Sequence, residues 1–372
     1  MSVNSFRRRV ENLLARADVT VDGDRPWDLQ VSHPGFFQRV LAQGSLGFGE
    51  AYMDGWWQSE SLDQLHYRLV STKLDQQVGS LVLYYDALRA KLLNRQRRSR
   101  AHIVGKRHYD IGNDLYRQML DSRMIYSCGY WKEAQTLDQA QEDKLQLTCS
   151  KLLLHEGQRV LDIGCGWGGT ARFMAERYGV EVVGVTISSA QAEVAREYCA
   201  GLPIEIRLQD YRSIEGTFDR IVSIGMFEHV GPKNYRTYFR KAAELLKDHG
   251  LFLLHTIGGN EPALSTDPWI DRYIFPNGVI PSAKQVTDGF EGCFVLEDWH
   301  NFGTDYDRTL MAWQDNFNKA WPDLSHNYDE RFRRMWLYYL SCAAACFRSR
   351  HNQLWQIVLS KQGIPGGWHF PR

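Results

Sequence analysis

The sequence lacks the features that mark membrane-spanning, exported or nucleic-acid-binding proteins. Its longest apolar run, residues 336–347, is interrupted by a serine and is shorter than the roughly 18 residues that cross a bilayer. The start, MSVNSFRRRVENLL, has no apolar core or small-residue cleavage site, so we expect no export signal. The 44 basic and 44 acidic residues cancel, which argues against the positive field of a phosphate-binding surface. We therefore predict a cytoplasmic protein with no nucleic-acid partner.

The cysteines are few, and their spacing shows no motif. There are seven of them, scattered along the chain, and no two form a C-x-x-C pair. An odd number without such spacing favours thiols in a reducing compartment over a disulfide framework or a zinc site. We predict no metal ion.

Length and composition indicate an ordinary globular protein of two or three domains. The chain has 372 residues, of which 44% are hydrophobic and 24% are charged. These fractions are close to the globular average and exclude collagen-like or largely disordered chains. No internal repeat or low-complexity segment is present.

The first part of the chain predicts a small helical domain, residues 1–93. Apolar residues recur every three or four positions in residues 3–17 and 62–69, as on the buried face of a helix. Between them, the glycine-rich GSLGFGEAYMDGWW (44–57) is predicted to be a compact irregular segment with aromatic anchors.

A basic linker, residues 94–103, is predicted to follow this domain. It lies within a longer run, Arg89–Arg107, that has eight basic residues and no acidic one. Such a run is either a solvated linker or a patch for an anionic membrane surface. The sequence leaves both interpretations open.

Residues 104–372 form the predicted catalytic domain, in which short apolar runs alternate with amphipathic stretches. This β-α alternation predicts an α/β fold with a doubly wound parallel sheet. The strands are expected at 159–164, 180–187, 204–208, 218–224 and 251–257, with helices at 169–178, 189–199 and 234–247. The later strings FVLEDWH and RTLMAWQ (308–314) are expected to complete the sheet as an antiparallel pair.

A glycine-rich turn follows the first of these strands. VLDIGCGWGG places Gly164, Gly166 and Gly168 between a strand and a helix, where the backbone can approach a ligand and the helix N-terminus offers free N–H groups. With Asp162 before it, the turn resembles the nucleotide loop of the Rossmann-like class I methyltransferases that bind S-adenosylmethionine. The alternative is the turn of a dinucleotide dehydrogenase.

The next two strands favour the methyltransferase interpretation. A dehydrogenase has an acidic residue at the end of its second strand, whereas this strand ends in GVTIS and offers Thr186 and Ser188 instead. Gln191, one helical turn on, can contact ribose. Asp210, after the third strand, can accept the adenine amino group. Taken singly, these residue types more often cap helices or form turns.

Several longer strings resemble the bacterial cyclopropane-fatty-acyl-phospholipid synthases. They are GSLGFGEAYMDGWW, HYDIGNDLYRQMLD, MIYSCGYW, VLDIGCGWGG, GMFEHVGPKNY, LLHTIG, DPWIDRYIFPNG, EDWHNFGTDYDRTLMAW and YYLSCAAACF. The resemblance implies transfer of a methylene group from S-adenosylmethionine to the cis double bond of an acyl chain in a membrane phospholipid. It also implies a lipid-binding N-terminal domain, a homodimer and peripheral association with the inner face of the cell membrane.

The resemblance further implies a bound bicarbonate ion that removes a proton from the carbocation. Its pocket maps onto Cys128, Glu228, His255, the main chain at Ile257, and Tyr306. Because Glu228 would repel the anion, either a proton is shared or His255 is charged. The structural alternatives are a hydrogen-bonded core histidine and a glutamate that caps a helix.

The same resemblance completes the cofactor set with Tyr126, Ser127 and Tyr211. This sequence differs from the family at one position. A cysteine that the family carries near its C-terminus is matched here by Ala343, between Cys342 and Cys346. A covalent thiol mechanism is therefore not expected.

Two other functions remain open at this point. The glycine loop suits equally a methyltransferase that acts on a soluble small-molecule nucleophile. A membrane-binding protein with a vestigial cofactor fold is the other alternative, and it predicts no turnover.

Overall fold

The computed structural model describes residues 3–74 and 112–369. These residues pack into two compact units. One contains residues 3–74, 265–276 and 306–352, and the other contains residues 112–264, 277–305 and 353–369. The sequence-based domain 104–372 is thus divided between both units. The predicted boundaries near residues 93 and 103 and the basic run Arg89–Arg107 lie outside the described residues.

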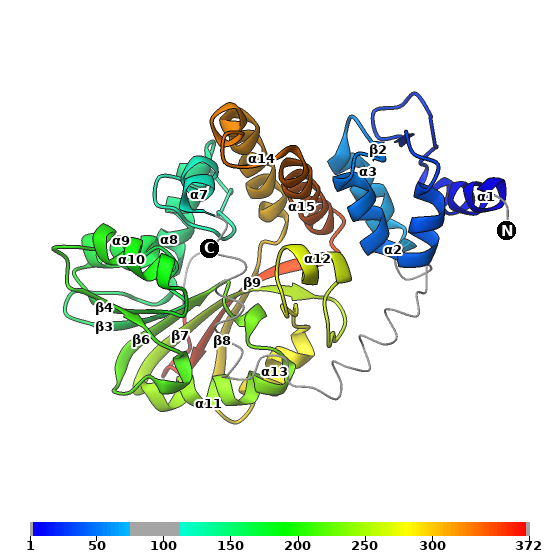
Figure 1. Ribbon diagram of the computed structural model, residues 1–372. Helices are drawn as coiled ribbons and strands as arrows, with labels where there is room; N and C mark the ends of the chain where they lie inside the picture. Colours follow the sequence, from blue (N-terminus) through cyan, green and yellow to red (C-terminus); the bar gives the residue numbers. More distant parts are fainter. Residues whose placement is uncertain (1–2, 75–111, 370–372) are drawn as a thin grey trace. The chain divides into compact units, whose positions relative to one another are not determined.

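The second unit is built on a seven-stranded sheet with the order β5-β4-β3-β6-β7-β9-β8 (Figure 1). Strands β3 to β7 pair in parallel, and β8 pairs with β9 antiparallel. The strands are β3 (Arg159–Ile163), β4 (Glu181–Thr186), β5 (Ile204–Leu208), β6 (Phe218–Ile224), β7 (Leu246–Gly259), β8 (Val295–Asn301) and β9 (Asn352–Ser360).

Among the described residues, six helices accompany this sheet. They are α7 (Asn113–Met119), α8 (Leu137–Lys151), α9 (Gly169–Tyr178), α10 (Ser189–Tyr198), α11 (Tyr235–Leu245) and α13 (Ala283–Phe290). Three of them begin at a side chain that satisfies a free backbone N–H. Thr136 caps α8 and Ser188 caps α10, while Ser282 forms a capping box with Gln285 at α13. The doubly wound α/β fold predicted from the sequence is confirmed.

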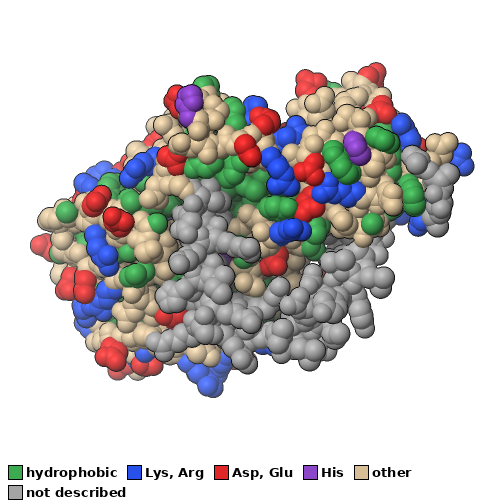
Figure 2. Space-filling view, viewed as in Figure 1, with side chains coloured by type: hydrophobic (Ala, Val, Ile, Leu, Met, Phe, Trp, Pro, Cys, Tyr) green, Lys and Arg blue, Asp and Glu red, His purple; other side chains and the backbone are tan. Residues whose placement is uncertain are grey.

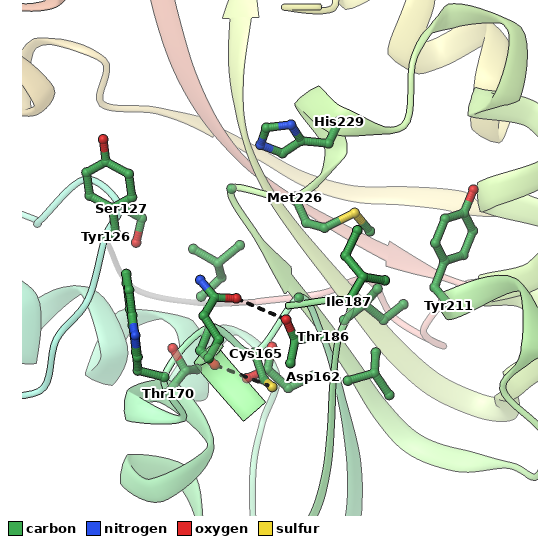
Figure 3. Close-up of a pocket in the computed structure, with 18 of the residues that line it drawn as sticks. Tyr126, Ser127, Asp162, Cys165, Thr170, Thr186, Ile187, Tyr211, Met226 and His229 are labelled. Atoms are coloured by element: carbon green, nitrogen blue, oxygen red, sulfur yellow. Dashed lines mark hydrogen bonds between the residues drawn. The ribbon is translucent and has the colours of Figure 1, made fainter. Parts of the chain in front are cut away.

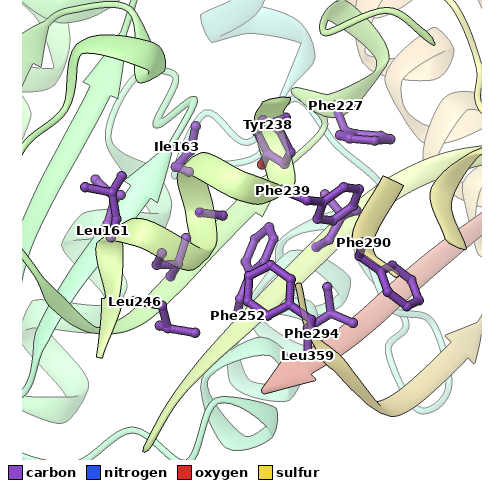
Figure 4. Packing of buried hydrophobic residues seen from close by; sticks show 14 of the residues in the cluster. Leu161, Ile163, Phe227, Tyr238, Phe239, Leu246, Phe252, Phe290, Phe294 and Leu359 are labelled. Atoms are coloured by element: carbon purple, nitrogen blue, oxygen red, sulfur yellow. The ribbon is translucent and has the colours of Figure 1, made fainter. Parts of the chain in front are cut away.

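Alternate residues of the strands supply two hydrophobic cores, one on each face of the sheet. On one face, Leu161 and Phe252 pack with the aromatic residues of α11 and α13, as Figure 4 shows. On the other face, their neighbours Val160 and Leu253 pack with α8 and α9. Burial on both faces explains why these strands read as continuous apolar runs in the sequence.

The predicted terminal pair of strands is wrong in one member. FVLEDWH contributes β8, but RTLMAWQ lies inside the helix α14 (Thr304–Leu324), and the true partner of β8 is β9. In α14, Leu310, Trp313 and Phe317 are buried at spacings of three and four, which is the period of a helix. A seven-residue window is too short to separate the two periods.

The first unit consists mainly of helices. They are α1 (Val3–Leu14), α2 (Phe36–Met53), α3 (Leu62–Ser71), α12 (Pro268–Tyr273), α14 and α15 (Glu330–Arg348), with a two-stranded sheet of β1 (Gln30–Val31) and β2 (Trp57–Gln58). In the ranges 3–74 and 112–369, no helix combines the length and apolarity needed to cross a bilayer. Acidic and basic side chains are interspersed on the face shown in Figure 2.

The glycine-rich segment 44–57 is not irregular as predicted. Most of it belongs to α2, which is kinked at Gly44 (φ 57°, ψ −134°). The later glycines allow close packing, since a Cβ on Gly49 would lie 2.5 Å from the Trp269 ring. The expected aromatic anchoring is present, with the Phe48 and Trp57 rings stacked at 4.4 Å.

Candidate active site

A cavity opens at the carboxyl ends of the parallel strands (Figure 3). The chain runs outward from β3 to β5 and then returns to β6 on the other side of β3, so a crevice forms where the strand order reverses. In Figure 3, Tyr126 and Ser127 lie on one side of the cavity and Tyr211 lies on the opposite side, with Asp162 near its base. All of the predicted cofactor residues line this cavity except Gly168 and Ser188.

The glycine turn brings backbone to the edge of the cavity. Gly164 and Gly168 have φ values of 89° and 88°, which favour glycine. A Cβ on Gly164 would lie 2.8 Å from the Cβ of Met226, and one on Gly168 would lie 2.8 Å from the sulfur of Cys199. Gly168 thus serves the packing of α9 against α10 and does not line the cavity.

The residues at the end of β4 and directly after it form a small hydrogen-bonded group. The Thr186 hydroxyl donates to Oε1 of Gln191 at 2.9 Å. The Ser188 hydroxyl accepts from the Gln191 N–H at 3.3 Å and caps α10. Ser188 therefore has the capping role that its residue type suggests, while Thr186 and Gln191 reach the cavity.

Asp210 is held by its neighbour Arg212. Its two carboxylate oxygens accept from Nε at 2.8 Å and from the terminal nitrogen at 2.6 Å. Both side chains line the cavity, so this charged pair faces the space in which a nucleoside would lie. Burial raises the pKa of the adjacent Tyr211 to about 12, so its hydroxyl keeps its hydrogen at neutral pH.

Asp162, which lines the cavity, and Lys144 are both buried. Burial raises the pKa of Asp162 to about 7, against the opposing charge of Lys144. Burial also lowers the pKa of Lys144 to about 8. The lysine ammonium donates to the Ser127 hydroxyl at 2.9 Å, so it ties this charged region to the loop that carries Tyr126 and Ser127.

Glu228 lies just after the end of β6, and His255 and Ile257 lie in the neighbouring strand β7, towards its end. The Ile257 N–H donates to Oε1 of Glu228 at 2.7 Å, and the Gly225 N–H donates to the His255 carbonyl at 2.9 Å. Among the described residues, Oε2 of Glu228 and Nε2 of His255 have no hydrogen-bond partner, although both atoms are buried. Two buried polar atoms without partners are the feature expected of a site that binds a polar ligand.

Burial disfavours the charged forms of Glu228 and His255. Burial raises the pKa of Glu228, against the hydrogen bond from Ile257. Burial and the charges of Lys144 and Lys151 lower the pKa of His255 well below its usual range. Of the two arrangements suggested by the sequence, the low pKa of His255 therefore argues against a charged histidine, and the raised pKa of Glu228 is in the direction that a shared proton requires.

The other two predicted catalytic residues have different surroundings. Cys128 is fully buried and its thiol donates to the Gly129 carbonyl at 3.1 Å. Tyr306 belongs to the first unit, where its ring packs 4.5 Å from Phe347 and 6.0 Å from Trp313. The expected roles of both residues stay predictions.

The cavity also contains residues that the sequence interpretation missed. They include Trp167, Thr170, Gln209, Arg212 and His229. Trp167 and Thr170 lie in or directly after the glycine string, and His229 follows Glu228, so proximity to the motifs was an available signal. The Trp167 indole N–H donates to Asn113 at 2.9 Å, a pairing over a long sequence distance that no local pattern reveals.

Comparison with known proteins gives a consistent result. Residues 96–357 match the model of the mycolic acid cyclopropane synthetase family. The chain is 53% identical over 372 residues to the cyclopropane-fatty-acyl-phospholipid synthase of Escherichia coli K12, covering 99% of this chain and 97% of that protein.

Solved structures agree with this match. The cyclopropane synthase MmaA2 of Mycobacterium tuberculosis is 31% identical with a TM-score of 0.66, covering 70% of this chain and 98% of that one. The mycolic acid cyclopropane synthase CmaA1, solved in complex with SAH and CTAB, is also 31% identical, with a TM-score of 0.65 over 70% of this chain and 98% of that one. Coclaurine N-methyltransferase, at 24% identity and a TM-score of 0.68 over 84% of this chain and 98% of that one, shares the fold. The chain therefore belongs to the cyclopropane synthase family of class I methyltransferases.

Proposed function

We propose that this protein transfers a methylene group from S-adenosylmethionine to the cis double bond of unsaturated acyl chains in membrane phospholipids, forming cyclopropane fatty acids. The observation that carries this proposal is the 53% identity to a cyclopropane-fatty-acyl-phospholipid synthase over almost the whole of both chains. The cavity adds the cofactor side, because it joins a glycine turn, a helix N-terminus and polar side chains at the reversal of the strand order.

The residues present suit S-adenosylmethionine. The absence of a Cβ at Gly164 opens the approach to the backbone. Gln191 and Asp210 both line the cavity, and we assign Gln191 to a ribose hydroxyl and the Asp210 carboxylate to the adenine amino group. When bound, the cofactor supplies an electrophilic methyl group on sulfur. An alkene is a weak nucleophile, so the protein has to hold the two groups in line and exclude water.

The pair Glu228 and His255 suits a small oxyanion, for which we propose bicarbonate. A protonated Glu228 can donate through Oε2, and a neutral His255 can donate through Nε2, so both partnerless atoms become satisfied. The Ile257 N–H is already taken by Glu228, which gives Ile257 the role of orienting the glutamate. A bicarbonate held there would supply the base for the proton lost on ring closure, with Cys128 and Tyr306 as further proposed contacts.

The cellular setting follows from the substrate. We propose a homodimer in the cytoplasm that associates peripherally with the inner face of the cell membrane. The N-terminal helices and the basic run Arg89–Arg107 are the proposed lipid-binding elements.

One experiment tests the proposal directly. Purified protein is incubated with S-adenosylmethionine and vesicles of phospholipids with cis-unsaturated acyl chains. The fatty acids are then extracted and their masses are determined by mass spectrometry. The expected result is a gain of one methylene per converted chain, with none for saturated vesicles. Methylation of soluble small molecules alone, or no turnover, would contradict the proposal.

Bicarbonate is tested by the same assay in buffers stripped of carbon dioxide. Turnover should fall and should return when bicarbonate is added, with no change in the Kd for S-adenosylmethionine. Turnover that stays constant would show that another base serves the reaction.

A further inference from the structure

Helix α8 buries a row of polar residues where a core helix usually has apolar ones. The row consists of Gln141, Lys144, Thr148 and Lys151, at spacings of three and four, and each is 0% exposed. Burying polar groups is costly unless each finds a partner. We call this row the polar face of α8.

Most members of the polar face contact groups near the active site. Gln141 donates to the Ser127 carbonyl at 2.7 Å, and Lys144 donates to the Ser127 hydroxyl at 2.9 Å. Lys151 forms an ion pair with Asp298 at 3.1 Å. These contacts leave the partner of Thr148 to be explained.

Thr148 fixes the orientation of an amide on the sheet. Its hydroxyl donates to the Lys144 carbonyl of its own helix at 2.8 Å, and it lies 3.0 Å from Nε2 of Gln356 in β9. A hydroxyl has only one hydrogen, so towards Gln356 it acts as an acceptor. The Gln356 side chain therefore presents its NH₂ group to Thr148.

The same NH₂ group reaches His255 in β7. Nε2 of Gln356 lies 3.4 Å from Nδ1 of His255, so this ring nitrogen faces a donor and accepts. A neutral imidazole has one N–H, which then lies on Nε2. That nitrogen is the buried atom with no partner among the described residues.

We propose that Thr148 and Gln356 are positioning residues, which hold His255 in the tautomer with hydrogen on Nε2 so that it donates to the oxyanion. The inference rests on the proposed function, because it needs an anionic base beside His255. The other tautomer would direct a lone pair at the anion and repel it. A hydrogen-bonded neighbour that selects the tautomer of a catalytic imidazole is a general device of enzyme sites.

The tautomer can be observed directly in the full-length protein. With ¹⁵N-labelled histidine, two-bond ¹H–¹⁵N spectra distinguish protonated from unprotonated ring nitrogens, and the His255 signals are those missing in His255→Asn. We expect hydrogen on Nε2 in the wild type and a mixture of tautomers in Gln356→Met. Hydrogen on Nδ1 in the wild type would overturn the proposal.

Kinetics provide the second measurement, with variants that differ by one hydrogen-bonding group. Thr148→Val has the same shape without the hydroxyl, and we expect kcat to fall about tenfold or more, as for a lost buried hydrogen bond, with the KM for S-adenosylmethionine unchanged. Thr148→Ser restores the hydroxyl and should restore kcat. Gln146→Met, on the exposed side of α8, is the control and should match the wild type.

The two measurements separate failure of this inference from failure of the proposed function. If Gln356→Met does not fold, the Thr148→Val and Thr148→Ser pair still decides the question. If vesicle turnover is present and Thr148→Val keeps both kcat and the wild-type tautomer, the positioning role of Thr148 and Gln356 is wrong while the proposed function stands. If vesicle turnover is absent in the wild type, the function fails, and the spectra alone show whether Thr148 and Gln356 set the tautomer.

Discussion

Glu228→Gln tests the active site most sharply, because it changes one atom of a buried side chain. The Gln side chain keeps an oxygen to accept from the Ile257 N–H, which now donates to Glu228 at 2.7 Å. It replaces the partnerless Oε2 with an NH₂ group, which can still donate to an anion but does not act as an acid. The local structure should therefore persist while the acid is lost.

We expect turnover to fall about tenfold or more in Glu228→Gln, because a hydrogen bond between an ionised and a neutral group is worth about 1.5–3 kcal/mol and the amide makes a weaker one. The Kd for S-adenosylmethionine should stay within about twofold, a difference of under about 0.5 kcal/mol. Glu228 does not line the cavity, although its neighbours Met226 and His229 do. Turnover in the vesicle assay and titration calorimetry measure the two quantities.

The same variant makes a prediction for stability. Burial raises the pKa of Glu228 in the folded protein, above the value of about 4.3 in an unfolded chain. The folded state then binds the proton more tightly, so wild-type stability falls as pH rises above about 4.3, by about 1.4 kcal/mol for each unit of the pKa difference. The melting temperature of Glu228→Gln should exceed that of the wild type at pH 8 and approach it near pH 5.

Two results would refute this reasoning. Wild-type turnover in Glu228→Gln would show that the residue serves only to hold Ile257. A melting temperature that falls equally at pH 5 and pH 8 would show that Glu228 is ionised in the folded protein.

Three further predictions concern other parts of the molecule. Gly164→Ala, which would place a Cβ 2.8 Å from that of Met226 at a φ of 89°, should weaken S-adenosylmethionine binding at least about tenfold by calorimetry, since strain of this kind costs about 1–3 kcal/mol; unchanged affinity would contradict a close backbone approach. Burial raises the pKa of Asp162 to about 7, so the stability of the wild type should fall as pH rises from about 4 to 7. In Asp162→Asn, the melting temperature should depend less on pH over this range. Burial lowers the pKa of His66 to about 3, so the first unit of the wild type should lose stability as pH falls below about 6.5, whereas His66→Gln should not. An equal loss of stability at low pH in both proteins would contradict this prediction.

Much of the sheet could be predicted from the sequence because its strands are buried on both faces. Each such strand is a short apolar run between turn residues, and the run at 204–208 matches β5 at both ends. The helices at 169–178 and 189–199 were recognisable for a different local reason, because a capping residue or a glycine stands at the start of each. The cofactor cavity followed, because strand ends and glycine turns are local features.

What the sequence could not reveal depends on long-range partners. The string RTLMAWQ has an apolar content that suits either a strand or a helix, and only the pairing of β8 with β9 decides. The glycines of α2 suggest an irregular loop until Trp269, more than two hundred residues away, is seen to pack on Gly49. The polar face of α8 was hidden because the helix sequence LDQAQEDKLQLTCSK has polar residues on every side.

The two buried lysines of α8 would favour the proposed bicarbonate at a site that contains a glutamate. The charges of Lys144 and Lys151 both contribute to lowering the pKa of His255, which means that they create a positive potential at the imidazole. The potential that opposes a proton on His255 favours an anion beside it, because the two effects have the same origin with opposite sign. In the proposed site, a neutral histidine and a protonated glutamate would donate hydrogen bonds to the anion, and the lysines would supply positive potential. Replacing Lys144 by Met should therefore weaken the activation of the enzyme by bicarbonate, and a variant that stays equally sensitive to bicarbonate would place the source of that charge elsewhere.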